Sequence, residues 1–302
     1  MQIAQLSAFH WAARLGSFTA AAQQLGIAQP SVSELVKRLE SEIGLRLFVR
    51  SGRRLTLTAA GDTLQPWAER LDNDLAAARR AMEELRGIRG GVASFGLLRN
   101  ASFYFLSDLA ARFHREHPGV QIRLVGQNSV GVAEAVRDGS LEAGFVVLPI
   151  DADGLDVTPI VRDRVLWASA DPSRVDRPFP IEKVADRPLI LYDAHYGWAD
   201  PTRRQLRDLA ERHGIALQPS IEVENVDAAL ELVAQGVGDT IVSGAVARHP
   251  MFPAGVHTGE LAEPLFDTIA LITRDGAVLS PVTRELVRVA NEMLMLSDLP
   301  AA

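Results

Sequence analysis

The chain of 302 residues contains no cysteine. This absence excludes a disulfide framework, a thiolate nucleophile, and a zinc or iron–sulfur site with cysteine ligands. No run of about 18 apolar residues is present to span a bilayer. Residues 1–16 also lack the basic start and sustained apolar centre of a secretory signal. We therefore expect a cytoplasmic protein with no membrane partner.

Enzyme signatures are also missing. The sequence has no G-x-S-x-G or Walker motif, and Gly236-x-Gly238 lacks the third glycine of a dinucleotide fingerprint. The pair His114-x-x-His117 has no identifiable third metal ligand, so a solvated helix face is the better interpretation. Residues 151–156 begin like a calcium loop but place the glycine too early. We predict a protein that is not an enzyme and has no metal or cofactor.

The chain is negatively charged overall, but its charge is unevenly distributed along the sequence. The formal net charge is −7, with 47% hydrophobic and 23% charged residues, a composition typical of a globular protein of two or three packed units. Residues 1–60 contain seven basic and three acidic residues, whereas residues 91–302 contain 19 basic and 29 acidic ones. A basic head on an acidic body suggests a polyanion partner for the head alone.

Residues 17–43 have the pattern of two amphipathic helices joined by a tight turn. The second helix places apolar side chains at i, i+3, i+4 and i+7, and Pro30 suits its first helical position. Gly26 closes the first helix, for which Ser17 or Thr19 is the candidate cap. This is helix-turn-helix spacing. The apolar positions of the second helix are Val32, Leu35, Val36 and Leu39.

Residues 47–58 follow this helix pair and read as two short strands around a Ser51-Gly52 turn. Arg50, Arg53 and Arg54 cluster near the tip of the predicted hairpin. A basic hairpin after a helix-turn-helix is typical of a winged helix that binds double-stranded DNA. An isolated amphipathic helix would more often be an ordinary solvated helix, but here the turn, the hairpin and the local positive charge lie together.

The segment 17–61 resembles the DNA-binding segment of LysR-type transcriptional regulators. The matching residues are Ala21, Ala22, Gln29, Pro30, Leu39, Glu40, Leu47, Phe48, Arg50, Leu57, Thr58 and Gly61. Two residues depart from the family. Ala28 stands where the family usually has serine, so the helix cap must come from Gln29 or from the capping-box pattern Ser31-x-x-Glu34. Glu34 stands where many relatives have a basic or amide residue, and its carboxylate repels phosphate but can accept a hydrogen bond from cytosine.

The predicted recognition helix offers two kinds of DNA contact. Recognition helices read bases with their N-terminal residues, so Gln29, Ser31 and Ser33 are the candidates for base edges. Basic side chains hold phosphate or a minor groove. The complete set of candidate DNA-binding residues is Gln29, Pro30, Ser31, Ser33, Glu34, Lys37, Arg38, Arg50, Arg53 and Arg54.

A helix over residues 59–89 is predicted to connect the head to the body. Its apolar residues follow the 4, 3, 4, 3 spacing of a coiled-coil seam, which favours a homodimer or a larger homo-oligomer over packing against its own body. Pro66 either kinks this helix or marks a later start. Two heads on one duplex predict an imperfect palindrome as the target. The seam consists of Leu64, Ala68, Leu71, Leu75, Ala78, Met82 and Leu85.

From residue 92 the pattern changes to short apolar strands that alternate with amphipathic helices. The first set has strands at 93–98, 120–126 and 142–148 and helices at 102–116 and 129–138. The second set has strands at 189–192, 221–224 and 239–244 and helices at 201–213 and 226–235. The sets echo each other, because 135–147 and 232–244 share a helix, a glycine and a strand at matching offsets. Such alternation predicts mostly parallel sheets in two lobes.

A strand at 266–274 and a final helix near 281–296 are expected to return to the first lobe. The arrangement is similar to the periplasmic-binding-protein-like effector domain of the LysR family. We therefore predict an α/β chain with a winged helix-turn-helix at 1–58, a linker helix at 59–89 and an effector-binding domain at 90–302. Lobe I would comprise about 91–160 and 267–302, and lobe II about 161–266.

In open α/β sheets, ligands bind beyond the carboxyl ends of the strands, where helix N-termini also point. This rule selects Arg99, Asn100, Ser102, Gln127, Asn128, Ser129 and the segment 147–149, with Val147 and Pro149, in lobe I. It selects the segment 193–196, with His195 and Tyr196, and Asn225 and Val226 across the cleft. The effector contacts of the LysR family fall at the positions matching Asn100 and Asn128.

Two helix N-termini beside Arg99 favour an anionic effector. Each contact has a plainer alternative: Asn100, Ser102 and Ser129 as helix caps, Arg99 in a surface ion pair, and His195 in a solvated loop. The resemblance implies a ligand-responsive regulator that binds DNA as a homo-oligomer, with RNA polymerase as a further candidate partner. The alternatives are a constitutive regulator without an effector, a cytoplasmic small-molecule-binding module, and an enzyme with a DNA-binding head.

Overall fold

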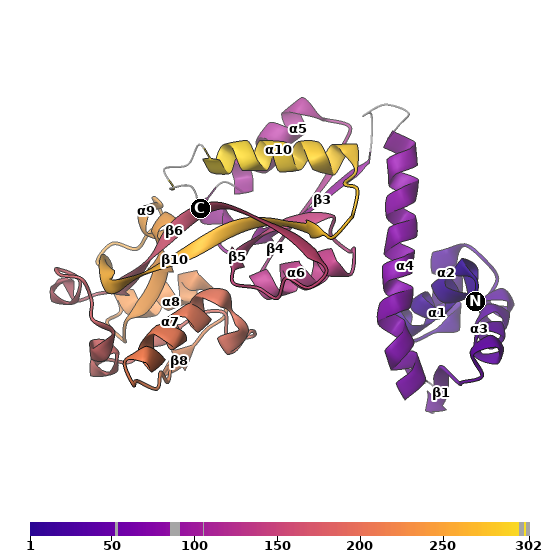
Figure 1. Cartoon of the computed structure of the whole chain (residues 1–302), viewed down its shortest axis with the longest axis horizontal. Helices are drawn as coiled ribbons and strands as arrows, with labels where there is room; N and C mark the ends of the chain where they lie inside the picture. The colour runs from indigo at the N-terminus through magenta and orange to yellow at the C-terminus, as the bar shows by residue number, and fades with distance from the viewer. Residues whose placement is uncertain (52–53, 85–90, 105, 296–298, 300–302) are drawn as a thin grey trace. The chain divides into compact units, whose positions relative to one another are not determined.

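The computed structural model describes residues 1–51, 54–84, 91–104, 106–295 and 299. Two compact units make up the chain, a head formed mainly by residues 1–86 and a body formed by nearly all of the remainder. Figure 1 shows the elements of each unit. Among the described residues, no helix has the length and apolar character that crossing a bilayer requires.

The head is a three-helix core followed by a hairpin and a long helix. Its elements are α1 (Ile3–Leu15), α2 (Phe18–Leu25), α3 (Gln29–Ile43), β1 (Phe48–Ser51), β2 (Arg54–Leu57) and α4 (Ala59–Glu84). Ser17 caps α2, because its hydroxyl accepts a hydrogen bond from the Ala20 N–H at 3.3 Å. Gly26 ends α2 in the left-handed conformation with φ of 67°, which glycine adopts without strain. The predicted winged helix-turn-helix is thus confirmed.

The start of α3 differs from the sequence prediction. Ala28 occupies the N-cap position and no side chain caps the helix, so neither Gln29 nor the Ser31-x-x-Glu34 pattern supplies the expected cap. Pro30 lies in the first turn, where its missing N–H removes no helical hydrogen bond. Packing holds the helix in place instead, because Val32, Val36 and Leu39 are fully or almost fully buried in the head core.

Glu40 joins the end of α3 to the start of the hairpin. Its side chain is 9% exposed, and its Oε1 accepts hydrogen bonds from the backbone N–H groups of Leu47 at 2.8 Å and Phe48 at 3.3 Å. The Phe48 ring then packs against Phe9 and Phe18 in the head core. The start of the wing is therefore anchored to the end of α3 through its backbone and to α1 and α2 through the Phe48 side chain.

Replacing Glu40 with alanine leaves the buried Leu47 N–H without this acceptor, which we expect to cost about 1–3 kcal/mol of unfolding free energy. Glu40→Gln retains an acceptor oxygen and should lose less. Urea denaturation gives the free energy, and amide hydrogen exchange at Leu47 and Phe48 locates the loss. Glu34→Ala, which removes an exposed carboxylate from the same helix, serves as the control. Unchanged exchange at Leu47 in Glu40→Ala would show that this anchor is dispensable.

The connecting helix α4 continues through Pro66, so the alternative of a later start is wrong. The first residues of the predicted seam pack onto their own head. Ala68 is completely buried in the head core and Leu64 is half-buried against it. Leu71 and Met82 are exposed, as is Ala78, and Leu75 is half-buried. Leu85 lies outside the described residues.

One six-stranded sheet runs through both lobes of the body, in the order β4-β3-β5-β10-β6-β9. The strands are β3 (Val92–Leu98), β4 (Gln121–Gln127), β5 (Ala143–Leu148), β6 (Leu155–Ser169), β9 (Thr240–Ser243) and β10 (His257–Arg274). Only the β4-β3-β5 pairings are parallel, and the other three neighbouring pairs are antiparallel, so the predicted mostly parallel sheet is wrong for this sheet. The two long strands β6 and β10 pair from Leu155 with Arg274 to Ser169 with His257 and connect the lobes.

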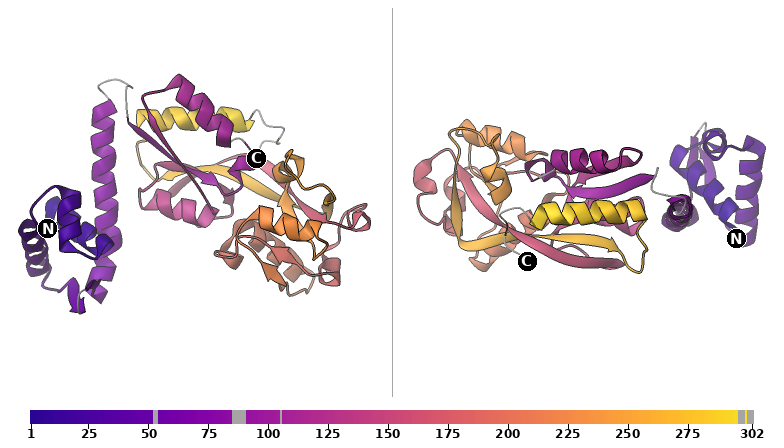
Figure 2. Two further views of the ribbon diagram at one scale, coloured as in Figure 1. Left: turned by 180° about the vertical axis from the view of Figure 1, so that it is seen from behind. Right: turned by 90° about the horizontal axis from the view of Figure 1, so that it is seen from above.

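In lobe I, helices cover both faces of the sheet, as Figures 1 and 2 show. The helices are α5 (Leu106–Glu116) and α10 (Pro281–Met295) on one face and α6 (Ser129–Arg137) on the other. The helix predicted over 102–116 is instead a 3-10 turn, η1 (Ala101–Phe103), followed by α5. Gly96 and Gly144 are paired in β3 and β5, and a Cβ atom at either would lie 2.5 Å from Cγ1 of Val132 in α6. These glycines allow α6, and thus Ser129 at its start, to lie close to the sheet.

Lobe II repeats the helix–glycine–strand unit of lobe I, as predicted. The unit is α6–Gly139–β5 in lobe I and α8–Gly236–β9 in lobe II, and both glycines have positive φ. The other elements of lobe II are η2 (Pro172–Arg174), η3 (Ile181–Asp186), β7 (Ile190–Leu191), η4 (Gly197–Ala199), α7 (Pro201–Arg212), β8 (Ile221–Glu222), α8 (Val226–Ala234) and α9 (Gly244–Arg248). Parallel pairing joins β7 to β8 in a separate two-stranded sheet.

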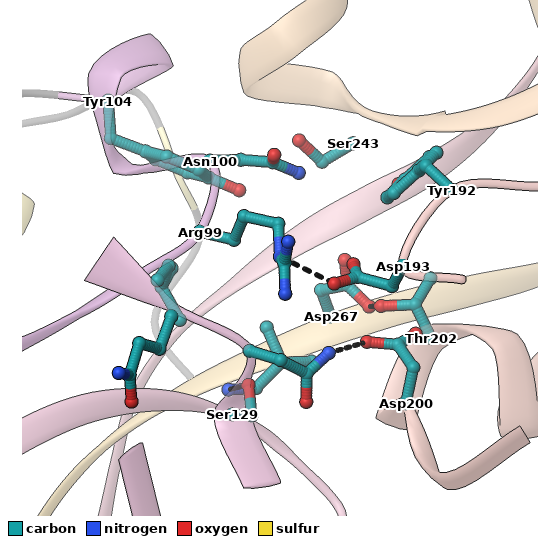
Figure 3. Close-up of a pocket in the computed structure, with 14 residues that line it drawn as sticks. Arg99, Asn100, Tyr104, Ser129, Tyr192, Asp193, Asp200, Thr202, Ser243 and Asp267 are labelled. Carbon is teal, nitrogen blue, oxygen red and sulfur yellow. Dashed lines mark hydrogen bonds and ion pairs between the residues drawn. The ribbon is translucent and has the colours of Figure 1, made fainter. Parts of the chain in front are cut away.

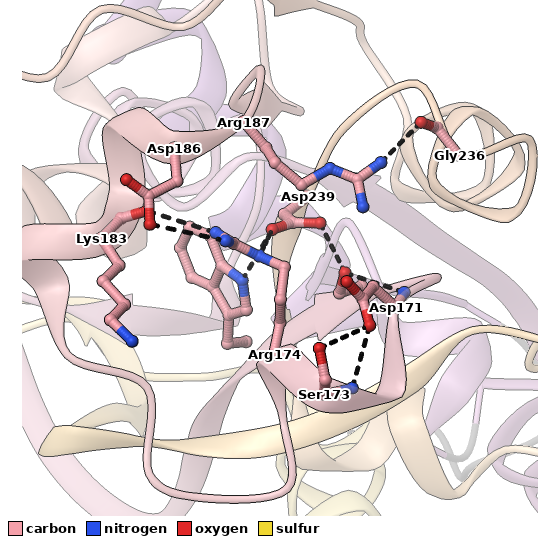
Figure 4. Close-up of polar contacts among 10 residues, drawn as sticks. Asp171, Ser173, Arg174, Lys183, Asp186, Arg187, Gly236 and Asp239 are labelled. Atoms are coloured by element: carbon pink, nitrogen blue, oxygen red, sulfur yellow. Dashed lines mark hydrogen bonds and ion pairs between the residues drawn. The ribbon is translucent and has the colours of Figure 1, made fainter.

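A buried polar network secures the far end of lobe II (Figure 4). Asp239, which is 1% exposed, accepts hydrogen bonds from the Ser169 hydroxyl at 2.6 Å, the Trp167 indole N–H at 3.3 Å and Nε of Arg174 at 2.5 Å. Asp239 directly precedes β9, so its carboxylate links the start of β9 to the end of β6 and to η2. Three protein donors thus satisfy this buried carboxylate, which is consistent with a structural role.

Candidate functional site

The head presents the polar face of α3 to solvent. Gln29, Pro30, Ser31, Glu34, Lys37 and Arg38 are exposed and Ser33 is half-buried. The opposite face is packed in the core, so the direction of the polar face is fixed by the fold. Nε of Arg38 contacts Oε1 of Glu34 at 3.0 Å, and the carboxylate that departs from the family is therefore balanced by a cation one turn away.

The predicted basic wing is only partly described. The backbones of Arg50 and Arg54 belong to the hairpin, in which Arg50 pairs with Leu55 and Ser51 pairs with Arg54. Arg53 lies outside the described residues. The described part of the surface combines amide, hydroxyl and cationic groups on one helix that stands clear of the core, which is the chemistry needed to contact bases and phosphates.

The body has a cavity of about 40 Å³ between its two lobes (Figure 3). It lies at the carboxyl ends of β3, β4 and β5, where the sequence rule placed a ligand. Seven predicted residues line it: Arg99, Asn100, Gln127, Asn128, Ser129, Val147 and, from the segment 193–196, Asp193. The lining is completed by Leu98, Tyr104, Tyr192, Asp200, Thr202, Ser243 and Asp267.

Direct contacts join the lobes across this cavity. Nε of Arg99 contacts Oδ1 of Asp193 at 2.5 Å, and its Nη1 contacts the Glu224 carboxylate. Nδ2 of Asn128 donates to Oδ2 of Asp200 at 2.7 Å, while Oδ1 of Asn128 accepts from the Val130 N–H at the start of α6. Arg99 and Asn128 therefore hold lobe II residues from lobe I, and the lobes are closed on each other.

Six other predicted residues do not line the cavity. Pro149 contributes its carbonyl oxygen to the Arg204 guanidinium, and the His195 N–H donates to Glu224 at 3.0 Å. The Val226 side chain is buried in a lobe II core. Ser102 is exposed in η1, Tyr196 immediately precedes η4, and Asn225 precedes α8 without capping it. The plainer alternatives predicted an ion pair for Arg99 and a helix cap for Asn100. Arg99 does form an ion pair, whereas the Asn100 side chain caps no helix.

Sequence reasoning missed much of the lobe II wall. Asp200 is the N-cap of α7, and its position before Pro201 is a helix-start signal that could have located it. Asp267 lies within β10, and Thr202 donates to it from its hydroxyl at 2.7 Å. A carboxylate in a buried strand is costly unless it has a role, and this was the available signal for Asp267.

The cavity wall is acidic. Asp193, Asp200 and Asp267 are at most 6% exposed. Burial raises the pKa of Asp267 to about 7, with Asp200 and Asp163 raising it further against the hydrogen bond from Thr202. Burial followed by the nearby Asp200 raises the pKa of Asp193 to about 7, although Arg99 opposes this shift. Burial also raises the pKa of Asp200. The anionic effector predicted from the sequence would therefore share the cavity with three carboxyl groups.

Comparison with known proteins supports both parts of the chain. The family model described as "Bacterial regulatory helix-turn-helix protein, lysR family" matches residues 3–62, and that described as "LysR substrate binding domain" matches residues 87–294. The chain is a LysR-type transcriptional regulator. The resemblance stated from the head sequence is thus confirmed over nearly the whole length, and the family is one of transcription regulators rather than enzymes.

Relatives of this LysR-type regulator include two curated bacterial proteins. The uncharacterized HTH-type transcriptional regulator YcgK of Bacillus subtilis (strain 168) is 29% identical over 256 residues, which cover 78% of each chain. The probable hydrogen peroxide-inducible genes activator of Mycobacterium leprae (strain TN) is 27% identical over 300 residues, covering 97% of this chain and 94% of that protein.

Solved structures show the same fold. Full-length OxyR from Pseudomonas aeruginosa superposes with a TM-score of 0.74 at 20% identity, covering 100% of this regulator and 98% of that chain. CbnR in complex with its target DNA gives a TM-score of 0.65 at 20% identity, covering 97% of this regulator and 100% of CbnR. The predicted architecture of a winged helix-turn-helix, a linker helix and a two-lobed α/β domain is therefore confirmed.

Replacing Asp267 with asparagine should stabilise this LysR-type regulator at pH 8. A buried carboxyl whose pKa rises to about 7 favours its protonated form when folded, so its contribution to stability falls as pH rises from about 4 to 7. Asparagine keeps an acceptor for Thr202 and never ionises. We expect Asp267→Asn to gain about 1–3 kcal/mol over the parent at pH 8 and little at pH 4.5.

Urea denaturation of the full chain at both pH values measures this difference. The control is Asp208→Asn, which removes an exposed carboxylate from α7 and should give no pH-dependent gain. An equal difference between parent and Asp267→Asn at the two pH values would mean that this carboxyl does not titrate between them.

Proposed function

We propose that this LysR-type regulator binds an imperfect palindrome in double-stranded DNA as a homodimer or larger homo-oligomer and responds to a small molecule held between its lobes. The observation that carries the proposal is the exposed polar face of α3, whose opposite face is fixed in the head core. Gln29, Ser31 and Ser33 contact base edges, and Lys37, Arg38 and the wing arginines hold the backbone. Acting on DNA, the regulator works in the cytoplasm, where RNA polymerase is the further candidate partner.

The CbnR complex supports this assignment of the head, because CbnR shares the fold of this chain and is bound to its target DNA. The relative from Mycobacterium leprae is named for hydrogen peroxide. This chain has no cysteine and therefore no thiol for a peroxide to oxidise, so we do not extend that response to it.

Transmission of the ligand signal requires that the ligand bind two lobe arrangements unequally. The cavity of about 40 Å³ is far smaller than the roughly 300–1,000 Å³ of sites for drug-sized ligands. The direct contacts of Arg99 and Asn128 with lobe II close it. A small ligand, or one that enters when these contacts open, fits such a cleft.

The double variant Gln29→Ala, Ser33→Ala tests the recognition face. Each lost base contact is worth about 1–3 kcal/mol, so binding to the intergenic DNA upstream of the regulator's own gene should weaken at least ten-fold. Gel-shift titration at about 150 mM salt measures the affinity. Gln218→Ala, Ser220→Ala removes the same two side-chain types from an exposed loop of the body and should bind as the parent does. A double variant with parental affinity would refute this recognition face.

The exposed apolar face of α4 supports the homodimer. Trp67, Leu71 and Met82 are 60%, 44% and 62% exposed and are spaced by four and eleven residues, which places them within one helical face. Trp67 lies outside the seam predicted from the sequence. Solvent-exposed apolar side chains gathered on one helix are typical of an oligomer interface.

Introducing a charge at this face should separate the subunits. We expect Leu71→Glu to be monomeric at micromolar concentration, because a buried carboxylate without a partner opposes association. Analytical ultracentrifugation gives the mass of the assembly. Gln235→Glu adds the same carboxylate to the exposed end of α8 and should leave the assembly unchanged. If Leu71→Glu sediments like the parent, the subunits associate through another surface.

A further inference from the structure

The charges lining the interlobe cavity are not balanced. Among the described residues that line the cavity, the cationic side chain is Arg99. Its guanidinium is already paired with Asp193 and Glu224. Within the residues that the structure describes, no ion pair joins Asp200 or Asp267 to a cation. Their partners are neutral donors: Asn128 and the Arg203 N–H for Asp200, and Thr202 and Gln205 for Asp267. Two buried carboxyl groups thus face the cavity without an ion-pair partner.

Tyr192 provides an independent observation. Its side chain follows β7, is 6% exposed, and lines the cavity beside Asp193 and Asp267 (Figure 3). Across the described part of the chain, its hydroxyl forms no hydrogen bond with a protein group. Burial, followed by the Asp267 and Asp200 carboxyls, raises the pKa of this hydroxyl. Polar groups of residues as buried as Tyr192 normally have a partner, so a hydroxyl that lines the cavity without a partner among the described protein groups points to a ligand.

We propose that the interlobe cavity receives the ammonium group of a small organic amine. The inference rests on the proposed function and specifies the ligand class of the same site. An ammonium group has three N–H donors and no acceptor. The Asp267 carboxylate and the Tyr192 hydroxyl offer acceptors on the lobe II side, and the Ser129 hydroxyl, which receives the Val147 N–H at 2.9 Å, lies on the lobe I side. The positive charge would give Asp267 the cationic partner that it lacks among the described residues.

A bare metal ion fits this cavity less well than an ammonium group does. Magnesium and calcium require about six oxygen ligands within roughly 2.0–2.6 Å, and therefore a tight cluster of donors. Among the described residues, the group of three acidic or histidine side chains with ligand atoms within 4.8 Å of one another is Glu116 at the end of α5, His117 directly after it and Glu285 on α10. The cleft carboxyls do not form such a group.

Isothermal titration of the full-length protein with methylammonium and 1,4-diaminobutane, at pH 8 and constant ionic strength, tests the proposal. Acetate and magnesium chloride are titrated in parallel. We expect saturable binding of at least one amine, weakened ten-fold or more by Asp267→Asn, since a hydrogen bond to a charged group is lost. Tyr192→Phe should weaken it about five-fold while preserving the ring and the packing. Asp208→Asn, outside the cleft, should bind as the parent does.

Three results with the amines would overturn the proposal: no binding of either amine, binding that Asp267→Asn and Tyr192→Phe leave unchanged, or binding that Asp208→Asn weakens equally. Binding of acetate or magnesium in place of the amines would also overturn it. Circular dichroism confirms that each variant is folded, and Tyr192→Phe retains the test if Asp267→Asn is not. The titration contains no DNA, so its failure leaves DNA binding by the head intact, whereas failure of the gel shift leaves the amine result standing.

Discussion

The antiparallel pairing of β6 with β10 is the interaction on which the body depends. These two strands carry the chain from lobe I to lobe II and back, and their hydrogen bonds continue through both lobes. The parallel strands of lobe I join one edge of this ribbon, because β5 pairs with β10, and β9 of lobe II joins the other edge by pairing with β6. Arg99 and Asn128 can reach Asp193 and Asp200 only because the ribbon holds the two walls at this separation.

Local sequence signals located most of the elements but not this ribbon. Gly26 and Ser17 mark helix ends through backbone conformation and capping, effects that depend on a few neighbouring residues. The pattern of residues 149–188 predicted no element, because β6 mixes buried and exposed positions irregularly and contains Pro159. Its stability comes from pairing with residues about a hundred positions later, and no local pattern reports that pairing.

Local signals predicted most of one wall of the candidate site but, of the opposite wall, only Asp193 in the segment 193–196. Arg99, Asn100, Gln127, Asn128 and Ser129 follow strands directly, so the rule for carboxyl ends selects them. The opposite wall is contributed by a helix N-cap at Asp200 and a long strand at Asp267. The sign of the cleft charge was therefore judged from Arg99 without the carboxyl groups that surround it. In the head, packing of the apolar face of α3 in the core turns its polar face to solvent. The periodicity of the sequence was therefore enough to locate both the apolar and the polar face.

The ribbon also restricts how the lobes can move. A slip of one residue between β6 and β10 would turn every side chain to the opposite face of the sheet, so sliding of the lobes past each other is blocked. Bending and twisting remain, and these concentrate where the ladder is already irregular. One such irregularity lies between Ile269 and Ala270 of β10, opposite Val161 and Pro159. The proline that obscured β6 in the sequence therefore lies where the two long strands change register.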